Sequence, residues 1–192
     1  MSERLITVFV SATTDLERER EVVGEALARF PVKLPWRIVR TPHPGEQTLA
    51  ALEEVRRADF CLVLIGQDIS APVGAELVAA RGAQVPVFVL VKKGPHTPAA
   101  RFFQYNSVES WESFSGAEDL RRLVVQLLAR GVLDRAVPLG LTGDEIGRLM
   151  EYVQKGEEEG PGVAGRTEPQ GAQEGAVLVS DRGRREADSG TS

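Results

Sequence analysis

Short stretches of apolar residues alternate along this chain with segments in which apolar positions recur every three or four residues. The short stretches predict strands, and the periodic segments predict amphipathic helices. The predicted strands span residues 5–12, 36–40, 60–65, 85–91 and 108–114. The predicted helices span residues 15–30, 46–57, 73–81, 97–104, 117–128 and 144–154. Thr14 or Asp15 is expected to cap the first helix, and Thr142 with Glu145 the last.

The stretch between residues 58 and 91 is the most informative part of this pattern. Two apolar runs flank one short helix there, which is typical of a βαβ unit in a parallel sheet. Strand–helix alternation over the whole pattern predicts an α/β three-layer sandwich with four or five parallel strands. We expect the flavodoxin-like strand order 2-1-3-4-5. This order places the loop at 11–15 beside the loop at 66–74.

The periodic pattern ends near residue 155. Residues 156–192 are rich in Gly, Glu, Arg and Ser, and residues 176–179 form the one apolar run in this segment. Such a segment buries too little apolar surface to offset the entropy lost on ordering. We therefore expect one α/β domain over residues 4–155 and a disordered tail over residues 156–192.

Composition narrows the class of protein. The 192 residues carry a net charge of −5, and 42% of them are hydrophobic, as in a soluble globular protein. The single cysteine, Cys61, excludes an intrachain disulfide, which favours a cytoplasmic location. The sequence shows no secretion signal and no apolar run near the about 20 residues that cross a bilayer. A mildly acidic chain offers no basic surface, so neither nucleic acid nor a membrane is an expected partner.

Glu76 is the candidate catalytic residue. It lies in the first turns of the predicted third helix, at the edge where ligands of parallel sheets bind. A carboxylate there can stabilise positive charge at a ribosyl carbon, or attack that carbon as a nucleophile. The alternative is an acid that only complements the helix dipole.

Four further residues are candidate ligand contacts at the same edge. Ser11 and Thr13 lie at the first strand–helix junction, where backbone N–H groups can receive an anion such as phosphate, although plain capping is an alternative. Asp68 follows the third strand, and Gly74 permits a close approach to the backbone, although both residue types also suit turns. The two histidines have no cysteine partners, so the sequence predicts no metal site and no cofactor.

Two segments resemble known families. Residues 8–21, V-F-V-S-A-T-T-D-L-E-R-E-R-E, resemble the start of a bacterial domain family of unknown function that is related in fold to TIR domains. Residues 58–81, A-D-F-C-L-V-L-I-G-Q-D-I-S-A-P-V-G-A-E-L-V-A-A-R, resemble nucleoside 2-deoxyribosyltransferases and TIR-type NAD hydrolases. The resemblance implies a TIR-like domain in which Glu76 matches the catalytic glutamate and Asp68 the acid that contacts ribose. Asp59 matches an acid that opens the strand and is often structural.

The sequence also departs from these families. The first strand lacks the Gly-Pro pair and the aromatic residue of the deoxyribosyltransferases, and Gln67-Asp68-Ile69 replaces an aromatic–glycine stretch of the family of unknown function. Two functions therefore stay open. One is cleavage or transfer at an N-glycosidic bond of a nucleoside or NAD-like ligand, which Glu76 and Asp68 favour. The other is a non-catalytic nucleotide-sensing or protein-interaction module in bacterial signalling or defence, which the departures favour.

Overall fold

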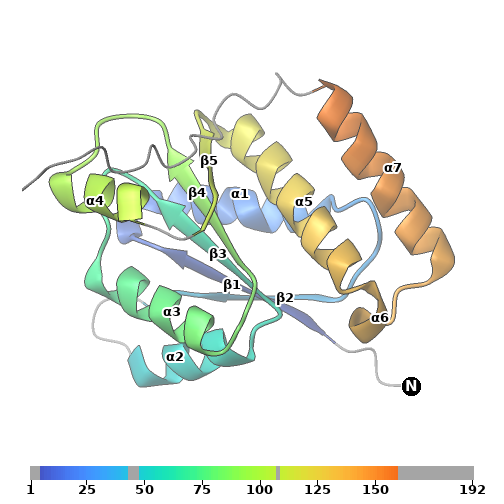
Figure 1. The fold of residues 1–192 in the computed structure, drawn as a ribbon, viewed down its shortest axis with the longest axis horizontal. Helices are drawn as coiled ribbons and strands as arrows, with labels where there is room; N and C mark the ends of the chain where they lie inside the picture. Colours follow the sequence, from blue (N-terminus) through green and yellow to red (C-terminus); the bar gives the residue numbers. More distant parts are fainter. Residues whose placement is uncertain (1–4, 43–47, 107–108, 160–192) are drawn as a thin grey trace, which may run out of the picture. The chain divides into compact units, whose positions relative to one another are not determined.

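The computed structural model describes residues 5–42, 48–106 and 109–159. Within these ranges strands and helices alternate along the chain, and two further helices follow the last strand–helix pair (Figure 1). The strands are β1 (Ile6–Ala12), β2 (Trp36–Arg40), β3 (Phe60–Ile65), β4 (Val87–Lys92) and β5 (Trp111–Phe114). The helices are η1 (Thr14–Leu16, a 3-10 turn), α1 (Glu17–Ala28), α2 (Thr48–Arg57), α3 (Ala71–Gly82), α4 (Pro98–Asn106), α5 (Ala117–Asp134), α6 (Ala136–Leu139) and α7 (Gly143–Glu159).

The strands form one parallel sheet in the order β2-β1-β3-β4-β5. The predicted α/β sandwich with a flavodoxin-like strand order is therefore confirmed. The register sets Val10 of β1 opposite Arg40 of β2, and Ser11 of β1 opposite Val63 of β3. The carboxyl end of β1 thus lies between the ends of β2 and β3.

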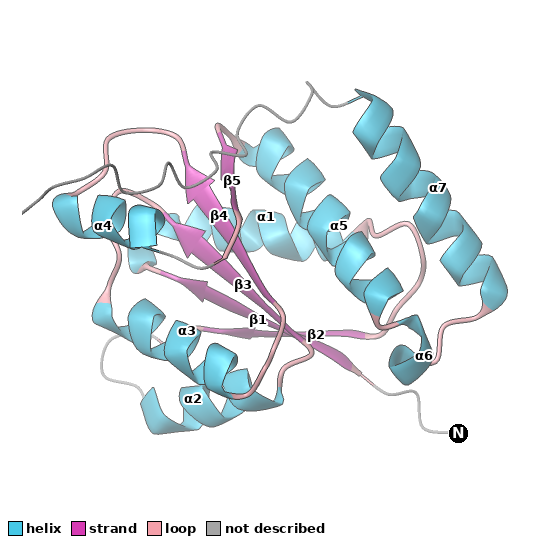
Figure 2. Cartoon of the chain, in the orientation of Figure 1, coloured by secondary structure: helices cyan, strands magenta, loops and turns pink. Residues whose placement is uncertain are grey.

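Helices cover both faces of the sheet (Figure 2). On one face α1 and α5 bury Val23 and Val124 against the strands. On the other face α2 and α3 bury Val55 and Leu77. Helix α7 packs on the outer side of α5.

Strand β3 shows why the central strands read as continuous apolar runs. All six of its residues are buried, because a strand between two helical layers has no solvent-facing side. Successive side chains point to opposite faces of the sheet. The α1–α5 layer receives Phe60, Leu62 and Leu64, and the α2–α3 layer receives Cys61, Val63 and Ile65.

The start of the first helix differs from the prediction. Thr14 and Asp15 do not cap it, because both belong to η1, and the residue before that turn is Thr13. The Thr13 side chain makes no capping hydrogen bond there. The apolar periodicity locates the helix correctly, but it cannot separate a 3-10 turn from the first turn of an α-helix.

The predicted start of the last helix is confirmed. Thr142 Oγ1 accepts a hydrogen bond from the backbone N–H of Glu145 at 3.3 Å, and the Glu145 carboxylate accepts one from the backbone N–H of Thr142 at 2.8 Å. These reciprocal bonds form a capping box. The helix then continues to Glu159, beyond the predicted domain end at residue 155. Gly156 does not end it, and a Cβ atom there would clash with the side-chain amide of Gln126 on α5.

The described residues, which end at Glu159, form one compact unit. The sequence predicts a disordered tail over residues 156–192, but residues 156–159 belong to α7. The rest of the predicted tail, residues 160–192, lies outside the described ranges. Within the described ranges, no helix combines the length and the apolar character needed to cross a membrane.

Candidate functional site

Glu76 lies on the side of α3 that faces the sheet, and its side chain is fully buried. Val73, Leu77 and Ala80 are buried on the same side, because steps of three and four residues return to one face of a helix. Ser11, near the end of β1, donates a hydrogen bond from Oγ to Oε2 of Glu76 at 2.5 Å. The structure therefore brings together two of the five residues that the sequence singled out.

Thr41 is a second partner of Glu76, and the sequence analysis missed it. Its Oγ1 donates to the same Oε2 at 2.8 Å and accepts from the backbone N–H of Ala12 at 3.1 Å. Its own backbone N–H donates to the carbonyl of Val10 at 3.2 Å, so Thr41 lies directly beyond β2, beside the end of β1. The predicted strand order could have identified Thr41, because the first residue beyond strand 2 lies at the same edge of the sheet as Ser11.

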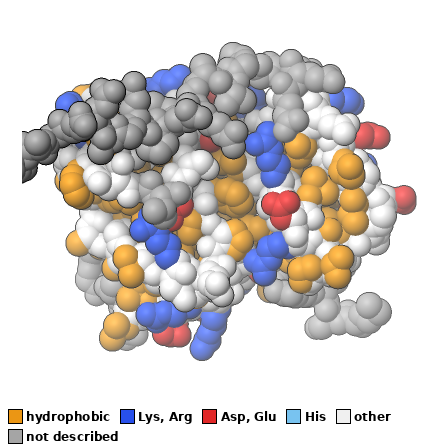
Figure 3. All heavy atoms as spheres, viewed as in Figure 1, with side chains coloured by type: hydrophobic (Ala, Val, Ile, Leu, Met, Phe, Trp, Pro, Cys, Tyr) orange, Lys and Arg blue, Asp and Glu red, His pale blue; other side chains and the backbone are white. Residues whose placement is uncertain are grey.

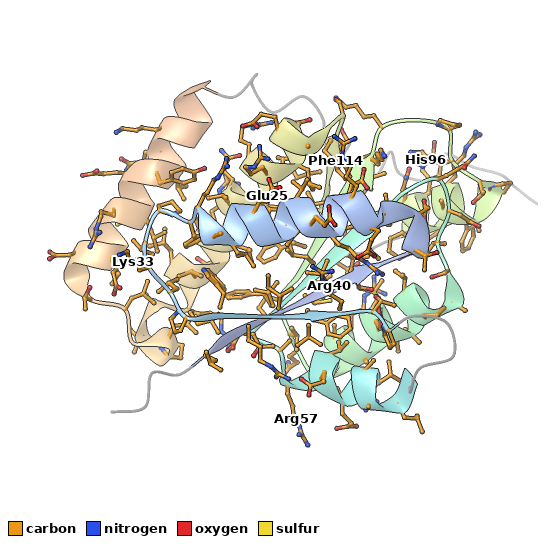
Figure 4. All side chains as sticks on the ribbon, turned by 180° about the vertical axis from the view of Figure 1, so that it is seen from behind. Glu25, Lys33, Arg40, Arg57, His96 and Phe114 are labelled. Atoms are coloured by element: carbon orange, nitrogen blue, oxygen red, sulfur yellow. The ribbon has the colours of Figure 1, made fainter. Side chains whose placement is uncertain are left out.

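Arg20 places a buried positive charge at the end of β1. Its guanidinium donates to the carbonyl of Ala12 and to the carboxylate of Glu17, the latter at 3.0 Å. Glu17 also accepts from Arg40, labelled beside β2 in Figure 4, at 3.2 Å. These bonds tie the first turn of α1 to the ends of β1 and β2. The Glu76 cluster, as we name it, consists of Ser11, Thr41, Glu76 and Arg20.

Opposing effects act on the pKa of the Glu76 carboxyl group. Burial raises its pKa, whereas the hydrogen bonds from Ser11 and Thr41 and the charge of Arg20 lower it. Burial also raises the pKa of the Cys61 thiol to about 12, and the negative charge of Glu76 adds to that rise. Cys61 therefore stays a neutral thiol near pH 7 and is not a candidate nucleophile.

Three buried polar atoms near the end of β1 make no hydrogen bond to any described residue. They are Oε1 of Glu76, Nε of Arg20 and Oγ1 of Thr13. A buried polar atom without a partner costs about 1 to 3 kcal/mol, and such atoms are uncommon in folded proteins. The carboxylate thus has one fully engaged oxygen, Oε2, and one free oxygen, Oε1.

Asp68 is engaged elsewhere. It is exposed, and its Oδ1 accepts hydrogen bonds from the hydroxyl of Thr97 and from the backbone N–H of Ile69. Both bonds lower the pKa of Asp68, and the bond from Thr97 has the larger effect. The loop after β3 is further fastened to the loop after β4, because the backbone N–H of Thr97 donates to the carbonyl of Gln67 at 2.9 Å. Asp68 therefore braces two loops and makes no hydrogen bond with the Glu76 cluster.

Gly74 lies on a different side of α3 from Glu76. Two residues correspond to a rotation of about 200° around a helix, so the two positions point in nearly opposite directions. A Cβ atom at Gly74 would have no heavy atom within 4 Å. Gly74 lines a shallow hollow of about 650 Å³ with Leu52 and Arg56 of α2 and with Val78. Figure 3 shows exposed hydrophobic side chains on this face of the molecule, and Val78 is 65% exposed.

A second hollow, of about 540 Å³, lies between α1, α5 and α7 and is lined by Arg29, Arg121 and Tyr152, among others. Neither hollow includes a residue of the Glu76 cluster. Because Glu76 has no exposed surface, a ligand reaches it only if the chain around it moves. Among the described residues, no group of three or more His, Cys, Asp or Glu side chains is placed to hold a metal ion.

No protein-family model matches the chain, and no curated protein sequence matches it. Among solved structures, the chain is similar to translation elongation factor SelB from Methanococcus maripaludis in its apo form. The identity is 17%, the TM-score is 0.44, and the match covers 67% of this chain and 35% of the factor. The chain therefore spans about a third of the length of that factor, and a likeness at this level says nothing about function.

Proposed function

We propose that this chain is a TIR-like domain that cleaves or transfers at an N-glycosidic bond of a nucleoside or NAD-like ligand, with Glu76 as the catalytic carboxylate. The observation that carries the proposal is the state of this carboxylate. Two hydroxyl groups hold Oε2, and Oε1 is buried at the carboxyl end of β1 without a partner among the described residues. The resemblance of residues 58–81 to deoxyribosyltransferases and TIR-type NAD hydrolases supports the same role. A cytoplasmic setting belongs to this proposal.

The chemistry needs an ionised carboxylate close to the sugar. When the C–N bond breaks, the base leaves with the electron pair and the sugar ring becomes positively charged. The carboxylate stabilises that charge, because its donors are already oriented before the reaction begins. In hydrolysis, water then forms the new C–O bond and its proton ends on the base or in solvent. In transfer, a second base forms the new C–N bond, and the proton that it loses ends on the departing base or in solvent. Ser11, Thr41 and Arg20 all favour the ionised form of Glu76.

Three observations favour a second function, a non-catalytic nucleotide-sensing or protein-interaction module. Glu76 is sealed inside the described structure, and Asp68 is occupied by Thr97. Helix α4 also exposes two aromatic side chains, with Phe102 70% and Tyr105 87% exposed, which suits contact with another protein. In this second function the Glu76 cluster only stabilises the sheet edge.

Product analysis distinguishes the two functions. The purified chain is incubated with NAD, with ribonucleosides and with 2′-deoxyribonucleosides, each with and without a second base, and released or exchanged base is quantified by chromatography. We expect base release or exchange from at least one of them. Glu76→Gln keeps the size of the side chain and removes its charge, so turnover should fall by at least a hundredfold. Glu151→Gln, at an exposed position of α7, should leave turnover unchanged.

Two results would count against the catalytic proposal. Turnover retained in Glu76→Gln would remove Glu76 from the mechanism. Ligand binding measured by calorimetry, with no base released by the wild-type chain, would favour the sensing module instead.

A further inference from the structure

We propose that Ser11 and Thr41 are positioning residues that hold Oε2 of Glu76 and reserve Oε1 for the ligand. This inference deepens the proposed function and rests on it for the role of Oε1. It replaces the expectation that Ser11 binds the ligand itself, and it adds Thr41, to which the sequence assigned no role.

The two carboxylate oxygens of Glu76 differ in their hydrogen bonding. Ser11 Oγ lies 2.5 Å and Thr41 Oγ1 lies 2.8 Å from Oε2, whereas Oε1 has no partner among the described residues. A carboxylate oxygen that accepts two hydroxyl donors is fixed in place and is a weaker base than its free counterpart. A proton or a positively charged carbon should therefore approach Oε1.

Thr41 is the donor in its hydrogen bond with Glu76. A hydroxyl group has one hydrogen to donate. Because Thr41 Oγ1 already accepts the N–H of Ala12, that hydrogen is free to point at Glu76. The backbone of β1 thus orients Thr41 as a donor, and a donor favours the ionised carboxylate. Thr41 transmits the position of the strand to the catalytic side chain.

The hydroxyl groups of Ser11 and Thr41 both lie inside the protein. Ser11 is fully buried and Thr41 is 7% exposed, and each spends its one hydrogen on Glu76. Neither hydroxyl therefore has a hydrogen left for a ligand. Two further titratable side chains are coupled to Glu76 among the described residues. Arg20 of α1 lowers the pKa of Glu76, and Glu76 raises the pKa of Cys61 of β3. Both are buried, so the surroundings of Glu76 are built by the fold rather than by solvent.

The test reads Glu76 directly, without requiring turnover. The side-chain carboxyl carbons are labelled with ¹³C, and the titration midpoint of Glu76 is followed by NMR in the full chain. Thr41→Val removes a hydrogen bond to a charged group, so the midpoint should rise by about one pH unit or more. Thr41→Ser keeps the hydroxyl and should return the midpoint close to the wild-type value. Ser11→Ala should shift it in the same direction as Thr41→Val.

Thr97→Val is the matched control, because it removes the same kind of hydroxyl from the exposed carboxylate of Asp68. It should move the midpoint of Asp68 and leave that of Glu76 in place. Urea unfolding of each variant shows whether it is folded under the titration conditions. An unchanged Glu76 midpoint in both Thr41→Val and Ser11→Ala, with both variants folded, would overturn the positioning role.

Kinetics with any substrate found separate positioning from ligand contact. We expect Ser11→Ala and Thr41→Val to lower kcat about tenfold or more with little change in KM, and Thr41→Ser to restore it. A raised KM with unchanged kcat would show that the hydroxyls contact the ligand and would overturn the inference. If the wild-type chain turns nothing over, the proposed function fails, and the titration alone decides whether Ser11 and Thr41 position Glu76.

Discussion

The ionised form of a carboxylate with no solvent exposure is stabilised only by hydrogen bonds and charges from its immediate neighbours. Removing an ionised group from water is costly, whereas each hydrogen bond to a charged group contributes about 1.5 to 3 kcal/mol. Glu76 has two such bonds, from Ser11 and Thr41, and the charge of Arg20 acts in the same direction. Burial nevertheless remains the largest effect on its pKa, which is raised.

This raised pKa predicts how stability depends on pH. Unfolded, Glu76 titrates near its ordinary value of 4.5, and folded it titrates at a higher pH. Between those two values the folded state binds more protons than the unfolded state, so this residue makes the free energy of unfolding fall as pH rises. Glu76→Gln removes this contribution. We therefore expect the stability of the variant, relative to wild type, to increase between pH 4.5 and the folded pKa and to level off above it.

Urea unfolding of both chains at pH steps from 4 to 8 measures this difference. Comparing the two chains cancels the titration of carboxylates that they share. Glu151→Gln makes the same substitution at an exposed position of α7 and serves as the control for the change of residue type. A wild-type chain that gains stability over Glu76→Gln as pH rises would show that the hydrogen bonds outweigh burial and that the pKa is lowered.

Some contacts of the candidate site could be predicted from the sequence, and others could not. The meeting of Ser11 and Glu76 was predictable, because residues that follow adjacent parallel strands share one edge of the sheet. The bond between Asp68 and Thr97 was not, because it depends on the path of two loops rather than on strand order. The complete burial of Glu76 was also not predictable, since polar residues are mostly exposed and the pattern around Glu76 does not mark it as an exception.

At the scale of elements, apolar periodicity located the helices and strands better than it located their ends. Strand β2 matches its prediction at both ends, whereas α5 extends to Asp134, six residues past the predicted end. Gly131 explains part of this difference. It looks unfavourable for a helix, but it lies where α5 crosses two aromatic rings of the sheet. A Cβ atom there would lie 2.9 Å from Phe60 and 2.9 Å from Phe88.

This close contact predicts opposite effects for two glycine-to-alanine changes. Gly131→Ala should lower the free energy of unfolding by about 1 to 3 kcal/mol, because the added methyl group overpacks the contact with Phe60 and Phe88. Gly147→Ala, on the exposed side of α7 with no heavy atom within 4 Å of the added Cβ, should raise it by about 0.5 to 1 kcal/mol through helix propensity. Denaturant unfolding of the two variants and the wild type measures both effects. A stabilising Gly131→Ala would mean that the two rings give way to the methyl group.

At the scale of the whole molecule, the fold class followed from the alternation of elements and the handedness of parallel crossovers. The alternation of strands and helices does not predict that α7 packs on the outer side of α5 and forms a further layer there. Leu149 of α7 is fully buried in the same hydrophobic cluster as Leu128 and Val132 of α5. An amphipathic pattern shows that α7 has an apolar face, but it does not identify the helix that covers that face.

The position of α7 predicts where the chain can be shortened. The hydrophobic clusters of both layers draw their buried residues from Ile6 to Leu149, so a chain that ends at Glu159 retains every described core residue. We expect it to unfold in urea at the same midpoint and with the same slope as the full chain. A chain that ends at Leu141 loses α7 and exposes the side of α5 that Leu149 covers, so its free energy of unfolding should fall by about 2 to 5 kcal/mol. A clear loss of stability in the chain ending at Glu159 would show that residues 160–192 contribute to the folded state.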